Sequence, residues 1–307
     1  MSQIAIIVLN WKKPQLTIDT IDSLLKINHK SFSYKIFLVD NGSPDNSVEI
    51  FKNKYKSNKK IKLVETKKNL GYVGGNNAGI VFALKSGFDS YLLINNDVLV
   101  DPNFLEILNK ASVKDKSIGI LGPKIYFAPG HEFHKDRYTK KQIGKIIWSA
   151  GGAIDWKNVL GSNVGIDDYD QGQYDQETYD PDFISGCCML IKKEVFQKIG
   201  LLNEDYFMYL EDMEICQRAK KNNYKLAYIP GSVIWHINAG SSSSGSPLHD
   251  YFITRNRLLF GFKYASFRTK FALFRESIKF YFFSKSAWKK TAVKDFYLNK
   301  LNKGSWQ

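Results

Sequence analysis

Cysteine is scarce in this chain of 307 residues, and long hydrophobic runs are missing. The three cysteines, Cys187, Cys188 and Cys216, are too few for a disulfide framework and lack the spacing of a zinc site. We therefore expect a reducing, cytoplasmic environment. No apolar stretch is long enough to span a bilayer, and the first residues have neither the basic flank nor the cleavage site of a signal peptide.

The glycine-rich segment Asn69 to Gly79 lacks the two common phosphate-binding patterns. It matches neither G-x-G-x-x-G nor G-x-x-x-x-G-K-[ST], so dehydrogenase and ATPase functions lose their main support. The segment still combines backbone freedom with side-chain amides just before a predicted helix. That arrangement suits the approach of a nucleotide or a phosphate.

Acidic residues are outnumbered, with 30 Asp and Glu against 44 Lys and Arg and a formal net charge of +14. The excess is concentrated in residues 251–307, which hold 13 basic and 2 acidic residues. The aromatic residues interleaved with this charge are Phe260, Phe262, Tyr264, Phe267, Phe271, Phe274, Phe280, Tyr281, Phe282, Phe283 and Trp288. This composition is typical of an amphipathic segment on an anionic membrane surface. The alternative is a helical pair that packs its aromatic residues on the main domain. No nucleic-acid-binding module is present, so no nucleic-acid partner is expected.

The first 125 residues alternate between short β-branched or aliphatic runs and segments of helical periodicity. The predicted strands are Ile4 to Leu9, Tyr34 to Val39, Ile61 to Glu65, Tyr91 to Ile94 and Ile118 to Leu121, and the predicted helices are Pro14 to Ile27, Asp45 to Tyr55, Gly75 to Lys85 and Asn103 to Lys114. This order predicts an α/β fold with a mostly parallel sheet and helices on both faces. Residues 127–150 and 167–182 are irregular and are expected to form long loops.

Asn95, Asn96 and Asp97 directly follow the apolar run Tyr91 to Ile94, which has the pattern of a buried strand. Open α/β sheets bind ligands at the carboxyl ends of their strands. A carboxylate at that place suits a divalent cation that bridges to phosphate oxygens. The alternative is that Asn-Asp makes a turn and Asp101 caps the next helix.

The second predicted strand ends in a similar way, with Asp40 and Asn41 followed by Gly42 and Ser43. An acid at this position could hold a ribose or the donor edge of a base. A capping turn is the alternative, because Asn-Gly and Ser are common turn formers.

Glu211, Asp212 and Glu214 stand at the opening of a predicted helix, where the helix dipole favours negative charge. One carboxylate could take the proton of a substrate hydroxyl, while the neighbouring acid orients it or tunes its pKa. The alternative is that these are ordinary first-turn residues and that Arg218 pairs with Glu214.

His236 ends the strand-like run Val233 to Trp235. A neutral imidazole is a suitable ligand for a Mn²⁺ or Mg²⁺ site that phosphate completes, and Asp97 could be its partner. A purely structural histidine is the alternative.

Seven segments, taken in order, carry a resemblance to a known family. They are Ile6 to Trp11, Val39 to Ser43, Asn69 to Gly79, Leu92 to Asp97, Ser185 to Ile191, Glu211-Asp212 and Trp235-His236, within roughly residues 4–260. Together they resemble glycosyltransferase family 2, the inverting transferases with a GT-A fold, and most closely its bacterial rhamnosyltransferase-like branch, which builds surface polysaccharides. The resemblance implies a GT-A domain over residues 1–250, with a nucleotide-binding half at 1–125 and an acceptor-binding and catalytic half at 126–250. A basic aromatic helical segment would follow at 251–307.

The resemblance also implies roles for individual residues. Asp212 would be the catalytic base, with Glu211 as support. Asn95-Asn96-Asp97 stands in the place of the family's metal-binding D-x-D, so Asp97 and His236 would hold a divalent cation, Mn²⁺ or Mg²⁺. Asn95 departs from that pattern because it carries no charge. The expected donor nucleotide-binding residues are Asn10, Asp40, Asn41, Asn69, Gly71, Asn76, Asn96 and Arg255.

The implied reaction moves a sugar from a nucleotide-diphosphate donor to a glycan or lipid-linked glycan acceptor. The favoured donor is dTDP-rhamnose, and a UDP-hexose is the alternative. Arg255, which follows the serine-rich loop Gly240 to Gly245, would neutralise the leaving diphosphate. The basic aromatic tail would hold the protein as a peripheral protein at the inner face of the cell membrane.

Two other classes of protein stay open. A non-catalytic carbohydrate- or membrane-binding protein would keep the fold without needing Asp212. A sugar-nucleotide pyrophosphorylase would share the sheet, but it needs a glycine-rich basic loop after the first strand, where this chain has Asn10 to Pro14.

Overall fold

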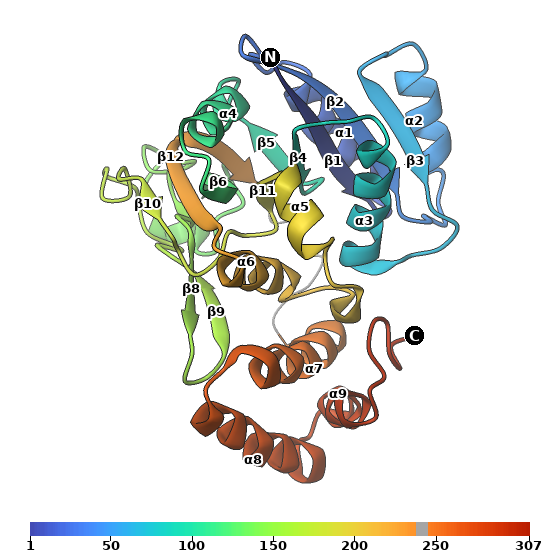
Figure 1. Cartoon of the computed structure of the whole chain (residues 1–307), viewed down its shortest axis with the longest axis vertical. Coiled ribbons are helices and arrows are strands. Elements are labelled where there is room, and N and C mark those ends of the chain that lie inside the picture. The colour runs from blue at the N-terminus through green and yellow to red at the C-terminus, as the bar shows by residue number, and fades with distance from the viewer. Residues whose placement is uncertain (238–244) are drawn as a thin grey trace.

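The computed structural model describes residues 1–237 and 245–307. Within these residues, ten strands form a curled central sheet, helices pack on its faces, and three C-terminal helices form a block at one end (Figure 1). The serine-rich loop predicted at Gly240 to Gly245 lies outside the described residues except for its last residue.

The first half of the chain alternates strand and helix as the sequence predicts, except that a short strand over Val98–Val100, which was not predicted, directly follows the fourth strand. Its elements are β1 (Ser2–Asn10), α1 (Pro14–Leu24), β2 (Phe32–Asp40), α2 (Ser47–Tyr55), β3 (Ile61–Glu65), α3 (Gly71–Leu84), β4 (Ser90–Ile94), β5 (Val98–Val100), α4 (Phe104–Lys114) and β6 (Ile118–Phe127). Helix α3 begins four residues before the predicted start, because the glycines of its first turn add nothing to a hydrophobic pattern. Strand β6 extends six residues past Leu121.

Parallel pairing brings the carboxyl ends of three strands to one edge of the sheet. Strand β1 is parallel to both β2 and β4, and Asn10 lies beside Asp40 in the β1–β2 register. Val8 lies beside Ile94, the last residue of β4, so the chain from Asn95 onward leaves the sheet at the same edge. We call this region, with the residues that follow β1, β2 and β4, the polar edge.

The second half of the chain adds antiparallel strands. Its elements are β7 (Ile147–Ser149), β8 (Gly152–Asp155), β9 (Leu160–Asn163), β10 (Thr178–Tyr179), β11 (Cys188–Lys192), α5 (Lys193–Ile199), α6 (Glu211–Lys221) and β12 (Lys225–His236). Strand β11 lies antiparallel between β4 and β6, which gives the order β10-β12-β6-β11-β4-β1-β2-β3. The sheet is therefore parallel from β3 to β4 and mixed beyond it.

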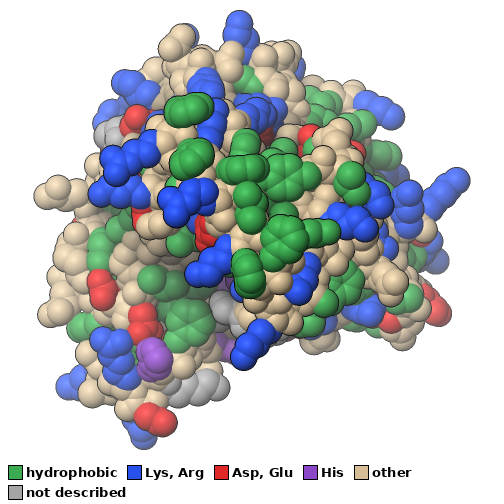
Figure 2. Space-filling view, turned by 90° about the horizontal axis from the view of Figure 1, so that it is seen from below, with side chains coloured by type: hydrophobic (Ala, Val, Ile, Leu, Met, Phe, Trp, Pro, Cys, Tyr) green, Lys and Arg blue, Asp and Glu red, His purple; other side chains and the backbone are tan. Residues whose placement is uncertain are grey.

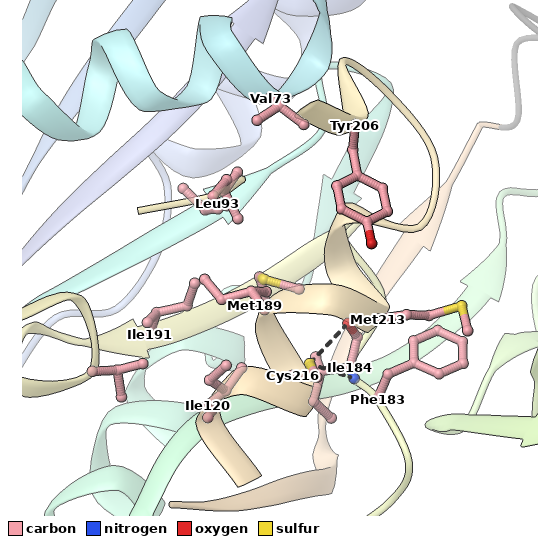
Figure 3. Packing of buried hydrophobic residues seen from close by; sticks show 14 of the residues in the cluster. Val73, Leu93, Ile120, Phe183, Ile184, Met189, Ile191, Tyr206, Met213 and Cys216 are labelled. Carbon is pink, nitrogen blue, oxygen red and sulfur yellow. Dashed lines mark hydrogen bonds between the residues drawn. The ribbon is translucent and has the colours of Figure 1, made fainter. Parts of the chain in front are cut away.

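Two hydrophobic cores lie on opposite faces of the sheet. Alternate residues of β1 point to opposite sides, so Ile7 belongs to one core and Ile6 and Val8 to the other. On the first face, side chains of α3 and α6 pack over those of β4, β6 and β11 (Figure 3). The thiol of Cys216 in α6 contacts the backbone of Ile184, and all three cysteines are buried free thiols.

The C-terminal block consists of α7 (Pro247–Tyr264), α8 (Phe267–Phe283) and α9 (Ala287–Tyr297). Aromatic residues of α7, such as Phe252 and Phe260, are fully buried, whereas those of α8 are largely exposed. The sequence left open whether the aromatic residues of this segment pack on the main domain. Those of α7 do. Across the described parts of the chain, no helix combines the length and the hydropathy needed to cross a membrane.

Candidate active site

A hydrogen-bond network joins the strands at the polar edge. Asn10 Nδ2 donates to Asp40 Oδ2 (2.8 Å), and Thr17 Oγ1 donates to Asn10 Oδ1 (2.7 Å). Asn96 Nδ2 donates to Thr17 Oγ1 (2.8 Å), which brings the segment after β4 into the network. Asp40 is 1% exposed, and its other oxygen accepts the backbone N–H of Ser43 (2.9 Å). Because both of its oxygens are engaged, Asp40 holds the shape of this edge.

Side-chain amides shape the turn that leads into α3. Asn41 Nδ2 donates to Asn69 Oδ1 (3.1 Å) and to the Gly71 carbonyl (2.9 Å), and Asn69 Oδ1 accepts the Gly71 N–H (2.8 Å). Gly71 has a φ of 74°, and a Cβ there would collide with Phe207, so this position requires glycine. Asn76 is buried and donates to a carbonyl one turn earlier in α3 (2.9 Å). Asn41, Asn69 and Gly71 therefore lie together, whereas the side-chain amide of Asn76 makes its hydrogen bond within its own helix.

Asp97 and His236 form a pair that joins two strand ends. His236 is the last residue of β12, and its Nε2 lies 3.2 Å from Asp97 Oδ1. The two side chains are 15% and 9% exposed, so the pair is mostly enclosed. Trp148 packs edge-on against the imidazole, with 4.6 Å between the ring centroids. The structure thus brings together the two residues that the sequence predicts as metal ligands.

The chemistry of this pair fits a divalent cation that has further ligands. A carboxylate suits a hard cation, and imidazole is a ligand that manganese accepts. Nδ1 of His236 is buried and has no hydrogen-bond partner in the described parts of the protein. Among the same residues, no group of three or more His, Cys, Asp or Glu side chains is arranged around a metal position. Two protein ligands are too few, so diphosphate oxygens would have to complete the coordination.

Asp212 lies at the start of α6 and is held by backbone groups. The Gly186 N–H donates to Asp212 Oδ2 (3.0 Å), and the Met213 N–H donates to Oδ1 (2.8 Å). The Tyr72 hydroxyl donates to the Gly186 carbonyl (2.6 Å), which holds the same residue from the side of α3. The turn before β11 and the ends of two helices thus meet at this carboxylate.

Burial raises the pKa of both adjacent acids. Burial and the charge of Asp212 raise the pKa of Glu211 to about 8. Burial also raises the pKa of Asp212, although backbone N–H groups stabilise its charged form. Glu211 Oε2 is buried and lacks a hydrogen-bond partner among the residues that the structure describes. The environment therefore favours a neutral Glu211 beside an Asp212 whose charge is better supported.

The segment that carries Asp97 is hydrogen-bonded to the turn that holds the Asp212 carboxylate. The Asn95 N–H donates to the Cys187 carbonyl (2.9 Å), and Cys187 follows Gly186 in the chain. Burial and, to a smaller extent, the charge of Asp97 raise the pKa of the Cys187 thiol. A path of hydrogen bonds and chain neighbours therefore runs from Asn95, two residues before Asp97, through Cys187 and Gly186 to Asp212.

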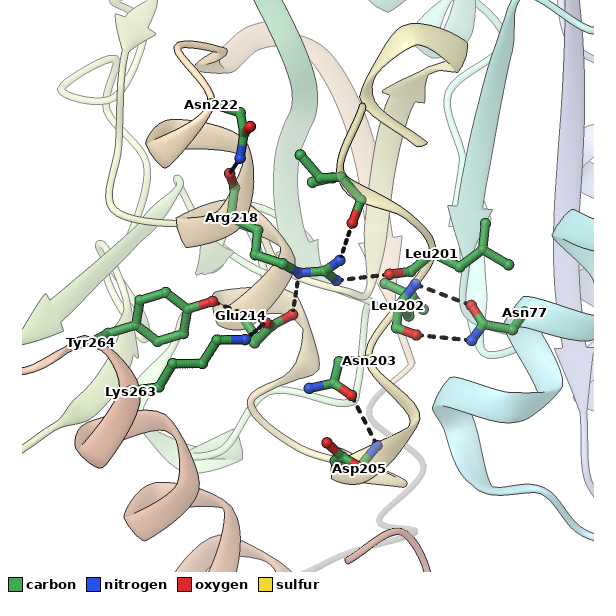
Figure 4. Close-up of polar contacts among 11 residues, drawn as sticks. Asn77, Leu201, Leu202, Asn203, Asp205, Glu214, Arg218, Asn222, Lys263 and Tyr264 are labelled. Atoms are coloured by element: carbon green, nitrogen blue, oxygen red, sulfur yellow. Dashed lines mark hydrogen bonds and ion pairs between the residues drawn. The ribbon is translucent and has the colours of Figure 1, made fainter. Parts of the chain in front are cut away.

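Buried polar contacts fix the orientation of α6 (Figure 4). Glu214 is fully buried and accepts hydrogen bonds from Arg218 Nε (2.8 Å), Lys263 Nζ (2.8 Å) and Tyr264 OH (2.9 Å). The guanidinium of Arg218 also donates to two backbone carbonyls at and after the end of α5. The alternative in which Arg218 pairs with Glu214 is confirmed, and Glu214 is structural.

Arg255 is enclosed by the protein, which contradicts its predicted contact with a diphosphate. Its side chain is 0% exposed, and its guanidinium donates to the carbonyls of Asp205 (3.1 Å) and Asn302 (2.5 Å). The rings of Tyr251 and Phe252 lie 5.4 and 5.1 Å from its Cζ. A buried arginine with these partners stabilises the C-terminal block, and the sequence pattern could not distinguish this from ligand binding.

Two further residues of the site carried no signal of their own in the sequence. Thr17 links Asn10 to Asn96, but in the sequence it is one more residue of a helical pattern. Tyr72 positions Gly186, yet the segment Asn69 to Gly79 draws attention to its glycines and amides.

Solved structures show which class of protein has this fold. The mannosyltransferase PcManGT from Pyrobaculum calidifontis, in complex with GDP-Man and Mn²⁺, superposes with a TM-score of 0.57 at 11% identity over 96% of this chain and 74% of that one. GalNAc-T7 with UDP, GalNAc and Mn²⁺ superposes with a TM-score of 0.62 at 16% identity over 91% of this chain and 57% of that one. The fold is therefore the GT-A fold of glycosyltransferases.

Sequence comparison gives the family. Residues 2–261 match the model "Glycosyltransferase like family 2", and the chain belongs to glycosyltransferase family 2. It is 26% identical to an N-acetylglucosaminyl-diphospho-decaprenol L-rhamnosyltransferase of Mycobacterium tuberculosis, over 70% of each chain. It is 25% identical to the low-salt glycan biosynthesis hexosyltransferase Agl10 of Haloferax volcanii, over 76% of this chain and 68% of that protein.

Proposed function

We propose that this protein is an inverting glycosyltransferase in which Asp212 is the catalytic base. The observation that carries the proposal is the Asp212 carboxylate, held by the Gly186 N–H at the start of α6 and connected through Gly186 and Cys187 to the segment that carries Asp97. Asp212 takes the proton of an acceptor hydroxyl while the hydroxyl oxygen bonds to the anomeric carbon. The bond from that carbon to the diphosphate oxygen breaks on the opposite face, and the configuration inverts.

Asp97 and His236 are the proposed protein ligands of a divalent cation, Mn²⁺ or Mg²⁺. When bound, such an ion stabilises the negative charge that develops on the leaving diphosphate. The presence of Mn²⁺ in the solved structures of both fold relatives supports this part of the proposal. Because Arg255 is enclosed, we give it no part in neutralising that charge.

The proposed donor is dTDP-rhamnose, with a UDP-hexose as the alternative. The names of the two relatives, a rhamnosyltransferase and a hexosyltransferase, support this range. The proposed donor-binding residues at the polar edge or in the turn into α3 are Asn10, Asp40, Asn41, Asn69, Gly71 and Asn96, and Asn76 within α3 is proposed with them.

The proposed acceptor is a glycan carried by a lipid, at the inner face of the cell membrane. The M. tuberculosis relative is named for an acceptor of this kind, which supports the proposal. A peripheral position at the membrane, through the C-terminal block, would bring the active site to such an acceptor.

Ligand-induced stabilisation tests the donor site. We expect dTDP or UDP with Mn²⁺ to raise the Tm, while GDP and NAD do not, because a ligand that binds only the folded state stabilises it by mass action. Asp97→Asn should abolish the Mn²⁺-dependent part of the shift, and Glu49→Gln, on the exposed side of α2, should keep it. Absence of any shift with a nucleotide diphosphate, together with absence of donor turnover, would favour a non-catalytic binding protein.

A further inference from the structure

Helix α8 exposes many large hydrophobic side chains to solvent. Its exposed residues are Phe267, Phe271, Phe274, Ile278, Tyr281, Phe282 and Phe283. Phe267 is 86% exposed, Phe282 is 62% exposed and Phe271 is 58% exposed. Single exposed hydrophobic residues are common on protein surfaces, but a contiguous group marks a site of interaction.

These side chains form a single stripe along the helix. Phe267, Phe271, Phe274, Ile278 and Tyr281 are separated by steps of three or four residues, and Phe282 lies beside the last of them. That spacing places them on one face of an α-helix. We call this face the α8 stripe.

Basic side chains border the α8 stripe. Arg268, Arg275 and Lys279 are exposed and follow the stripe along one flank, and Lys270 lies on the other. The acidic residue of this helix, Glu276, is paired with Arg257 at 2.9 Å. Seen from the end of the molecule that carries the C-terminal helices, Figure 2 shows a hydrophobic patch bordered by Lys and Arg side chains.

The remaining face of α8 anchors the helix to the protein. Thr269, Leu273 and Ser277 are its buried residues, and Leu273 packs directly on Gly261 of α7. Thr269 Oγ1 donates to the carbonyl of Trp156 (3.2 Å), in the turn between β8 and β9. The α8 stripe is therefore held outward by contacts on the opposite side of the helix.

We propose that the α8 stripe docks on an anionic lipid bilayer. Aromatic residues favour the interface between water and lipid, and the flanking Lys and Arg complement negatively charged headgroups. At 17 residues, about 25 Å, the helix would lie in the plane of the interface. A second copy of this chain is a poorer partner, because a symmetric contact would bring the same basic residues together. The inference deepens the proposed function, on which its biological purpose rests, by naming the surface that meets the acceptor's membrane.

Vesicle co-sedimentation of the full-length protein tests the docking. Vesicles of phosphatidylcholine with phosphatidylglycerol should bind the protein at low ionic strength, and pure phosphatidylcholine vesicles should bind it weakly. Phe271→Ser combined with Phe282→Ser should reduce the bound fraction at least about fivefold, because the inserted aromatic area is lost. Arg275→Gln combined with Lys279→Gln should also reduce binding, most strongly at low salt.

Matched controls separate this surface from general charge and hydrophobicity. Lys56→Gln with Lys59→Gln removes two exposed positive charges near the end of α2, and Val113→Ser removes a 63% exposed hydrophobic residue of α4. These controls should bind vesicles like the wild type. All variants change exposed side chains, so an unchanged Tm shows that each has folded.

Three results would overturn the proposal. The first is wild-type protein that stays in the supernatant with phosphatidylglycerol vesicles, and the second is equal binding by the Phe271/Phe282 variant. The third is a wild-type dimer in light scattering that this variant converts to a monomer. The assay contains neither donor nor acceptor, so its outcome is separate from that of the donor-turnover test.

Discussion

Glu211 and Asp212 are neighbours in the chain, yet their side chains have different surroundings. Both oxygens of Asp212 accept backbone N–H groups, whereas one oxygen of Glu211 is buried without a partner in the described structure. Hydrogen bonds to a carboxylate favour its charged form, and burial opposes it. The two acids are thus suited to different protonation states, which supports Asp212 rather than Glu211 as the base.

We predict that Asp212→Asn lowers kcat at least about a hundredfold, because an amide is too weak a base to take the proton of the attacking hydroxyl. Nucleotide affinity should stay within about twofold, since the change lies on the acceptor side of the reaction. Steady-state kinetics and nucleotide titration measure the two quantities, with Glu49→Gln as the control for loss of a remote carboxylate. Near-normal turnover in Asp212→Asn would rule out the assigned base.

Glu211 should make the stability of the protein depend on pH. Its pKa is raised from 4.5 to about 8 in the folded protein, so its contribution to stability is fully present below the unfolded pKa. That contribution is lost as the pH rises through about 8. Glu211→Gln removes the titration, and its Tm should fall less than that of the wild type between about pH 5 and pH 9. If the Tm of the two proteins changes with pH in the same way across this interval, the raised pKa is refuted.

At the scale of elements, α7 holds the segment directly before α6, the helix that begins with Glu211 and Asp212. Phe207, Tyr209 and Leu210 have φ values of 61°, 68° and 64° directly before α6, a conformation that non-glycine residues rarely adopt. Asn256 of α7 donates to the carbonyls of Tyr206 (2.8 Å), Met208 (2.7 Å) and Tyr209 (3.0 Å). These contacts offset the cost of the unusual backbone and fix the start of α6.

Asn256→Leu keeps the number of side-chain heavy atoms and the branching at Cγ, but it removes the Nδ2 donor that binds the carbonyls of Met208 and Tyr209. We predict a loss of about 2 kcal/mol in the free energy of unfolding, measured by urea denaturation, and a larger proportional fall in kcat than in nucleotide affinity. Asn53→Leu changes the same amide at an exposed site of α2 and should have little effect. An unchanged kcat in Asn256→Leu would show that this clamp does not position the acids.

At the scale of the whole molecule, the C-terminus closes back on the main body. The Asn302 N–H and side chain donate to the carbonyls of Asp205 and Glu204, both at 2.8 Å, and the Asn302 carbonyl accepts from Arg255. Ser305 donates to Asp295, which also accepts from Tyr251. The last residues are therefore part of the folded structure, although their composition resembles that of a tail.

Deletion of residues 298–307 should destabilise the whole protein by at least about 2 kcal/mol, because buried Arg255 loses an acceptor. Asn302→Ala keeps the backbone carbonyl and should cost less than the deletion. Calorimetry on the full-length, truncated and Asn302→Ala proteins measures the difference. Equal stability of the truncated and full-length proteins would mean that the C-terminal segment is dispensable for the fold.

Local sequence patterns predicted most elements of the first half, although not β5, and they indicated several candidate site residues. Strand β1 through strand β4 followed from periodicity, because each element buries side chains at a fixed spacing. Asp97, Asp40 and Asp212 were predicted as candidates from their places at strand ends and at a helix start, since parallel strands bring their carboxyl ends to one edge.

Tertiary structure decided what sequence spacing cannot express. The antiparallel place of β11 depends on pairing between segments far apart in the chain, and so do the Asp97–His236 contact and the link from Tyr72 through Gly186 to Asp212. Burial decided the rest: the basic and aromatic residues near the C-terminus look alike in sequence, but packing enclosed Arg255 and left the α8 stripe exposed. The sequence by itself determined which residues could act, and the packing determined which of them are enclosed by the protein and which are exposed, because desolvation and contact depend on neighbours that lie far away along the chain.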